Sequence, residues 1–96
     1  MRTLAAIALF FALGACASVG GGPRQDWRCD GGAAFSARVS SRNAEVFAGG
    51  QVYRLRRAES ASGARFADGD VEFWEHQGQA RLTGARGGPY MNCQRT

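Results

Sequence analysis

Short runs in which apolar and polar residues alternate are the feature that most constrains how this chain can fold. After Asp26 no apolar run has helical spacing, and a two-residue period recurs at 35–39, 53–56, 71–75 and 80–83. Clusters of Gly, Asn and Asp separate these runs: 30–32, 41–43, 49–50, 68–69, 76–78 and 87–88. Roughly eight strands of four to seven residues should form a sheet that curls and closes on itself, because closure removes exposed strand edges. The pattern predicts an all-β domain, a small antiparallel β-barrel.

The N-terminal residues are typical of an export signal. Arg2 precedes ten apolar residues at 4–13, about half of the 20 that a helix needs to cross a bilayer. The string Leu-Gly-Ala-Cys at 13–16 then resembles the lipobox of bacterial lipoproteins, in which small residues fit the peptidase and the cysteine thiol takes the lipid. Because Ala17 follows Cys16, the resemblance implies release to the outer membrane. An ordinary secretory signal, with Cys16 incidental, is the alternative.

The chain accordingly divides into three parts. We expect a lipoprotein signal peptide at 1–15, a lipidated Cys16 with a flexible Gly-rich tether at 16–25, and one barrel domain at 26–96. Once Cys16 carries lipid, Cys29 and Cys93 are the cysteines that remain, and in an oxidising compartment they should form a disulfide between the terminal strands. A zinc site is the weaker alternative, because two thiols and one histidine lack paired ligand spacing.

Composition argues against an enzyme and against nucleic-acid binding. The formal charge is +4 and all 12 cations are Arg; such a chain could bind nucleic acid, but an exported one is in the wrong compartment. Four carboxylates at 68–75 could suggest a glycosidase pair or a calcium loop, although this spacing is more typical of a solvated surface. There is no Gly-x-Ser-x-Gly elbow and no lysine for a phosphate loop. A barrel this small fills its interior with side chains, so we expect no catalytic residue, cofactor or metal.

The segment 60–66, Ser-Ala-Ser-Gly-Ala-Arg-Phe, should protrude as a loop between two strands. On composition alone it is a connector. Several further elements share a pattern with it: Cys29-Asp30-Gly31, Tyr53-x-Leu55, Asp68-Gly69, Phe73-Trp74, Ala80-x-Leu82 and Cys93. Together, over about residues 27–93, they resemble the membrane-bound inhibitors of c-type lysozyme, the MliC family. Members of that family are lipoproteins or periplasmic proteins with an eight-stranded barrel, and they block the lysozyme cleft.

The resemblance implies that the loop around Ser62 enters the cleft and that its hydroxyl bonds the two catalytic carboxyl groups, since a hydroxyl both donates and accepts. The implied lysozyme-binding residues are Ser60, Ser62, Gly63, Arg65 and His76. The family pattern Trp-x-Lys-Gly is Trp-Glu-His-Gln at 74–77 here, so His76 stands where the family's lysine supplies a cation. A histidine is a cation only near or below about pH 6.5. The alternative for His76 is that it fills a turn.

Local charge fits a basic partner. Between Ser60 and Gln79 one Arg stands against four carboxylates, a net −3, whereas c-type lysozymes are typically basic. The first hypothesis is therefore an outer-membrane lipoprotein that faces the periplasm, is held by lipid on Cys16, and protects peptidoglycan by inhibiting c-type lysozyme. The second is a structural or adhesive envelope lipoprotein with the same fold and no inhibitory activity.

The lipobox resemblance gives a direct test. Replacing Cys16 with Ser should abolish lipidation, because serine lacks the thiol that takes the diacylglyceryl group, and the protein should be released or left uncleaved. Membrane fractionation with mass spectrometry of the N-terminus measures this. Acylated Cys16→Ser protein in the membrane fraction would contradict the assignment.

Overall fold

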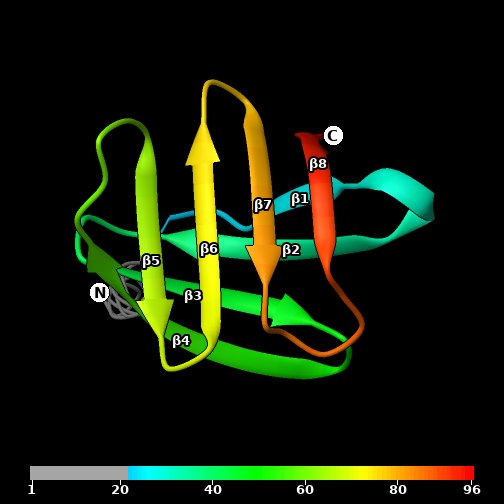
Figure 1. Ribbon diagram of the computed structural model, residues 1–96, viewed down its shortest axis with the longest axis horizontal. Coiled ribbons are helices and arrows are strands. Elements are labelled where there is room, and N and C mark those ends of the chain that lie inside the picture. Colours follow the sequence, from blue (N-terminus) through cyan, green and yellow to red (C-terminus); the bar gives the residue numbers. More distant parts are fainter. Residues whose placement is uncertain (1–21) are drawn as a thin grey trace, which may run out of the picture.

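The computed structural model describes residues 22–96, which form a closed barrel of eight antiparallel strands (Figure 1). The strands are β1 (Gln25–Arg28), β2 (Ala34–Val39), β3 (Asn43–Ala48), β4 (Gln51–Ala58), β5 (Ala64–Asp68), β6 (Val71–His76), β7 (Gln79–Thr83) and β8 (Tyr90–Arg95). The short 3-10 turn η2 (Asp30–Gly32) follows β1. The predicted all-β barrel is confirmed. The expected signal peptide, Cys16 and residues 17–21 of the expected tether lie outside the described residues.

Aromatic side chains fill the interior because the inward positions of the alternating runs carry them. Phe66 on β5 and Phe73 on β6 are paired across the ladder and fully buried. Phe35 on β2 lies 5.7 Å from Phe73 and 5.4 Å from Tyr90 between ring centroids, both edge to face. Edge contacts of this kind add to the free energy that burying the rings already supplies.

The strands form two layers around this core. Figure 1 shows β1–β4 crossing behind β5–β8 at a steep angle, with the segment after β4 leading from one layer to the other. That segment and the turn between β6 and β7 lie at the same end of the β5–β8 layer. Within residues 22–96 no helix is long and apolar enough to cross a bilayer.

The barrel closes through a short ladder and a disulfide. Strands β1 and β8 pair only at Trp27↔Arg95 and Arg28↔Gln94. The next residue along, Cys29, is bonded to Cys93 of β8, so the predicted disulfide between the ends of the domain is confirmed. The backbone N–H of Thr96 also donates to the carbonyl of Asp26 at 3.0 Å.

One expected boundary is wrong. The protruding loop was expected to extend to Phe66, but β5 begins at Ala64 and the loop is limited to residues 59–63. The reason is hydrophobic: Phe66 pairs with Phe73 and is fully buried, which draws Ala64 and Arg65 into the ladder with it. Strand β4, with eight residues, is also one longer than expected.

Replacing both Cys29 and Cys93 with alanine should lower the free energy of unfolding by about 4 kcal/mol, because the bridge joins residues 64 apart and restricts the unfolded chain. Urea denaturation of the lipid-free barrel, residues 22–96, measures this, and wild type with the disulfide reduced should unfold at the same midpoint as the double variant. An unchanged unfolding midpoint in the double variant would show that the bridge does not stabilise the fold.

Candidate functional site

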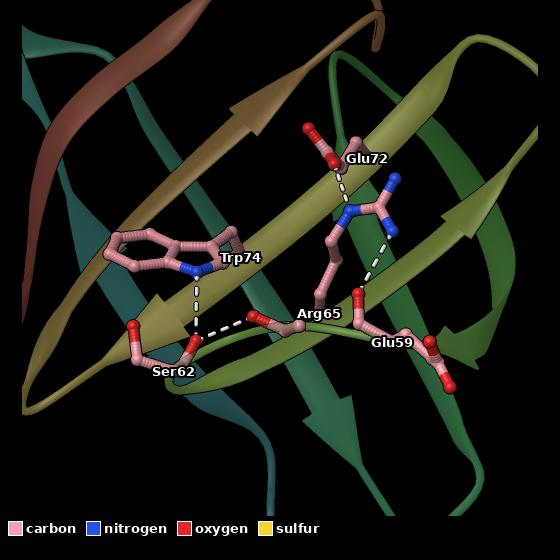
Figure 2. Close-up of polar contacts among 6 residues, drawn as sticks. Glu59, Ser62, Arg65, Glu72 and Trp74 are labelled. Carbon is pink, nitrogen blue, oxygen red and sulfur yellow. Dashed lines mark hydrogen bonds and ion pairs between the residues drawn. The ribbon is translucent and has the colours of Figure 1, made fainter.

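The loop 59–63 is organised around one backbone oxygen. The carbonyl of Ser62 accepts a hydrogen bond from the indole Nε1–H of Trp74, at 3.3 Å, and another from the Ser60 hydroxyl, at 2.6 Å. Figure 2 shows both bonds meeting at that oxygen. Trp74 belongs to β6, so the bond fixes the middle of the loop to the sheet.

The start of the loop is held by Arg65. Its guanidinium donates to the carbonyl of Glu59 at 3.2 Å and forms an ion pair through Nε with Glu72 of β6 (Figure 2). The Arg65 side chain is 38% exposed. The Glu72 carboxylate balances the positive charge of Arg65, and the bond to Glu59 holds the loop in place. Arg65 is therefore a support of the loop and not a free cation.

The end of the loop lies directly against β6. Gly63 has φ +73°, and a Cβ there would lie 2.4 Å from the carbonyl oxygen of Glu75 and 2.8 Å from Cβ of His76. Only glycine fits both this left-handed conformation and this close approach. The contact places the last residue of the loop beside His76.

Two polar side chains at this end have no hydrogen bond within residues 22–96. The hydroxyl of exposed Ser62 is one; its carbonyl, not its side chain, makes the two bonds drawn in Figure 2. The half-exposed imidazole of His76 is the other, tilted against the Trp74 ring with 5.8 Å between centroids. Both groups are available to a partner.

The surrounding charges are arranged in pairs. Glu72 is bound to Arg65, and Glu75 accepts from Arg95 of β8 at 3.1 Å. The Arg81 guanidinium lies 5.1 Å from the centre of the Trp74 ring, within cation–π range.

A depression open to solvent borders the loop. It is lined by Arg57, Ala58, Glu59, Ser60, Ala61 and Gly63.

The structure thus brings the five predicted binding residues, Ser60, Ser62, Gly63, Arg65 and His76, to one end of the β5–β8 layer. Their role in binding stays a prediction. Sequence reasoning missed Trp74 and Glu72 as supports of the loop. Their signal was their spacing, since positions 72, 74 and 76 share one face of a strand. Within residues 22–96 no three His, Cys, Asp or Glu side chains gather as metal ligands would.

Comparison with known proteins gives one match. The family model described as "MliC: Membrane-bound lysozyme-inhibitor of c-type lysozyme" matches residues 27–91, from β1 into β8. No curated protein and no solved structure matches.

Replacing Gly63 with Ala should displace the loop, because the new Cβ would overlap the Glu75 carbonyl and the side chain of His76. We expect the Trp74 indole N–H resonance to shift in an NMR spectrum as its bond to Ser62 breaks. Gly69→Ala is the matched control: Gly69 has φ +61°, and nothing lies within 4 Å of the position that a Cβ would take there. A Trp74 resonance that is equally unmoved in both variants would contradict the described contact.

Proposed function

This chain belongs to the MliC family of membrane-bound inhibitors of c-type lysozyme, and from that premise we propose that it inhibits such a lysozyme by inserting loop 59–63 into the active-site cleft. The family is one of inhibitors and not of enzymes. The observation that carries the proposal is the double hydrogen bond to the Ser62 carbonyl, which leaves the Ser62 hydroxyl free at the tip of a fixed loop.

A loop that is already ordered binds with a smaller entropic cost. Trp74 holds its middle, Arg65 its start and the contact of Gly63 with β6 its end. Rigid segments lose less conformational freedom when they enter a pocket. We propose that Arg65 contributes in this way, as a positioning residue, because Glu72 already matches its charge.

The chemistry of the free groups suits the partner. Lysozyme cuts with two carboxyl groups that flank the glycosidic bond, one acting as acid and one ionised. A serine hydroxyl can accept from the first and donate to the second. A protonated His76, which lies beside Gly63, would add a charge-assisted contact to the same carboxylates.

The cellular setting of the proposal follows from the N-terminal sequence. We propose that lipid on Cys16 holds the protein in the outer membrane, facing the periplasm, with the segment between Cys16 and the start of β1 at Gln25 as tether. The supports are the lipobox resemblance and a family whose members are membrane-bound. There the barrel would protect peptidoglycan from lysozyme that has entered the envelope.

A second candidate is an envelope lipoprotein that keeps the barrel without inhibiting anything. The specific observation in its favour is His76, which stands where the family pattern has a lysine. A lysis assay with c-type lysozyme and the lipid-free protein separates the two candidates, since absence of inhibition at micromolar excess would favour the second.

Replacing Ser62 with Ala should weaken inhibition roughly 10- to 150-fold, because a buried hydrogen bond to a charged group contributes about 1.5–3 kcal/mol. The inhibition constant measures this. Ser41→Ala, which changes another exposed serine, in the β2–β3 turn, is the control and should leave inhibition unchanged. Equal inhibition constants for the two variants would place Ser62 outside the contact.

Replacing His76 with Lys should strengthen inhibition about tenfold, because lysine supplies the permanent cation that the family pattern has at this position, and a cation forms charge-assisted contacts with carboxylates.

Inhibition constants for wild type and His76→Lys measure the effect. Gln79→Lys adds the same charge at the position paired with His76 on β7 and serves as the control. An inhibition constant that is unchanged in His76→Lys, or an equal gain in Gln79→Lys, would show that position 76 does not face the carboxylates.

A further inference from the structure

Charge is divided unequally between the two layers of the barrel. Residues 24–58, which include β1–β4, carry seven Arg and three acidic side chains, a net +4. Residues 59–96, which include β5–β8, carry four Arg and five acidic side chains, a net −1. The acidic half suits a basic lysozyme, but nothing in the proposed inhibition uses the basic half.

The excess cations lie together on the outer face of β2–β4. Arg38, Glu45 and Arg54 are cross-strand neighbours in one row, and Glu45 contacts the guanidinium of Arg38 at 3.8 Å and of Arg54 at 3.3 Å. One carboxylate is therefore shared by two cations. Arg56, on the same side of β4 as Arg54, is exposed and pairs with uncharged Asn43, so the row is left with a positive excess.

Next to these cations the face is partly apolar. Phe47 of β3 is paired with Val52 of β4, which is 50% exposed. The Arg24 guanidinium lies 4.0 Å from the centre of the Phe47 ring and donates through Nε to the Ser36 hydroxyl at 2.8 Å. Arginines around exposed apolar side chains are the composition of surfaces that lie at a membrane interface.

We propose that this face, formed by Arg24, Arg38, Arg54 and Arg56 with Phe47 and Val52, lies against the headgroups of anionic phospholipids. Guanidinium groups bind phosphate oxygens with two parallel N–H donors. Basic residues near a membrane surface are attracted by its negative potential. The positive charge of this face therefore favours an anionic partner. The proposed lipid anchor makes the membrane the anionic surface within its reach.

The tether joins the barrel at this face, since Arg24 packs on Phe47. Eight residue steps separate Arg24 from Cys16, so a lipid on Cys16 keeps the face within about 29 Å of the membrane. At that distance even weak contacts between this face and the headgroups form, because the tether keeps the two surfaces together and makes their binding intramolecular. This step rests on the proposed lipid anchor. With the basic layer on the membrane, loop 59–63 at the end of the other layer (Figure 1) stays accessible to lysozyme.

The test uses the lipid-free barrel, residues 22–96, which is a complete closed sheet with its own core and disulfide. Cosedimentation with vesicles of phosphatidylglycerol and phosphatidylcholine in equal parts is compared with vesicles of phosphatidylcholine alone. We expect binding only to the first, weakened by salt. Replacing Arg54 and Arg56 with Gln should weaken it about 25-fold, about fivefold for each arginine. The Arg54 side chain is 78% exposed, so the core is not disturbed.

The matched control replaces Arg81 and Arg95 with Gln, an equal loss of charge from β7 and β8. An equal loss of vesicle binding in both pairs, or no binding to anionic vesicles by the wild type, would overturn the proposal. Tighter binding to double-stranded DNA than to vesicles at the same salt would also overturn it, by assigning the face to a different polyanion.

Lysozyme inhibition by the same proteins separates this proposal from the proposed function. The Arg54/Arg56 double variant should inhibit as wild type does, since neither residue lines the depression beside loop 59–63 or is one of the five predicted binding residues. Vesicle binding without inhibition in the wild type would overturn the proposed function and support this surface.

Discussion

Closure of the sheet is the constraint on which the rest of the structure depends. Strands β1 and β8 meet over only two residue pairs, whereas β3 and β4 meet over six. The Cys29–Cys93 bond next to this short ladder keeps the first and last strands together. A closed sheet has no free edge and directs its aromatic side chains toward one another, so Phe35, Phe66 and Phe73 form one core. That core fixes the β5–β6 register that supports the loop.

The position of loop 59–63 depends on that β5–β6 register. Arg65 and Trp74 are directly opposite each other on β5 and β6. Arg65 donates to the carbonyl of Glu59, and Trp74 donates to the carbonyl of Ser62. Backbone oxygens are therefore satisfied by the barrel itself, and the side chains of Ser62 and His76 remain for a partner. In the proposed complex, Ser62 would contact lysozyme through its hydroxyl, while its carbonyl holds the loop to the barrel.

The sequence was sufficient for the architecture because alternation and turn clusters are local signals. Eight strands followed from them, and the Cys29–Cys93 pairing followed from the cysteine count once Cys16 was set aside for lipid. The end of the loop did not, because a small polar segment gives no sign that Phe66 pairs with Phe73. Spacing puts Glu72 and Trp74 on the same strand face as His76, but the bonds from Trp74 to Ser62 and from Arg65 to Glu72 depend on ladder register, which spacing does not give. The sequence therefore predicted Arg65 as a binding residue, whereas in the structure it is paired with Glu72 and supports the loop.

The central claim is that the loop occupies the lysozyme cleft, and competition with a cleft ligand tests it most directly. The affinity of c-type lysozyme for this protein would be measured with and without a saturating chitin oligosaccharide. Because the oligosaccharide fills the same cleft, the apparent affinity should fall by a factor of one plus the ratio of the oligosaccharide concentration to its own Kd for lysozyme. An affinity that does not change when the cleft is filled would contradict the account.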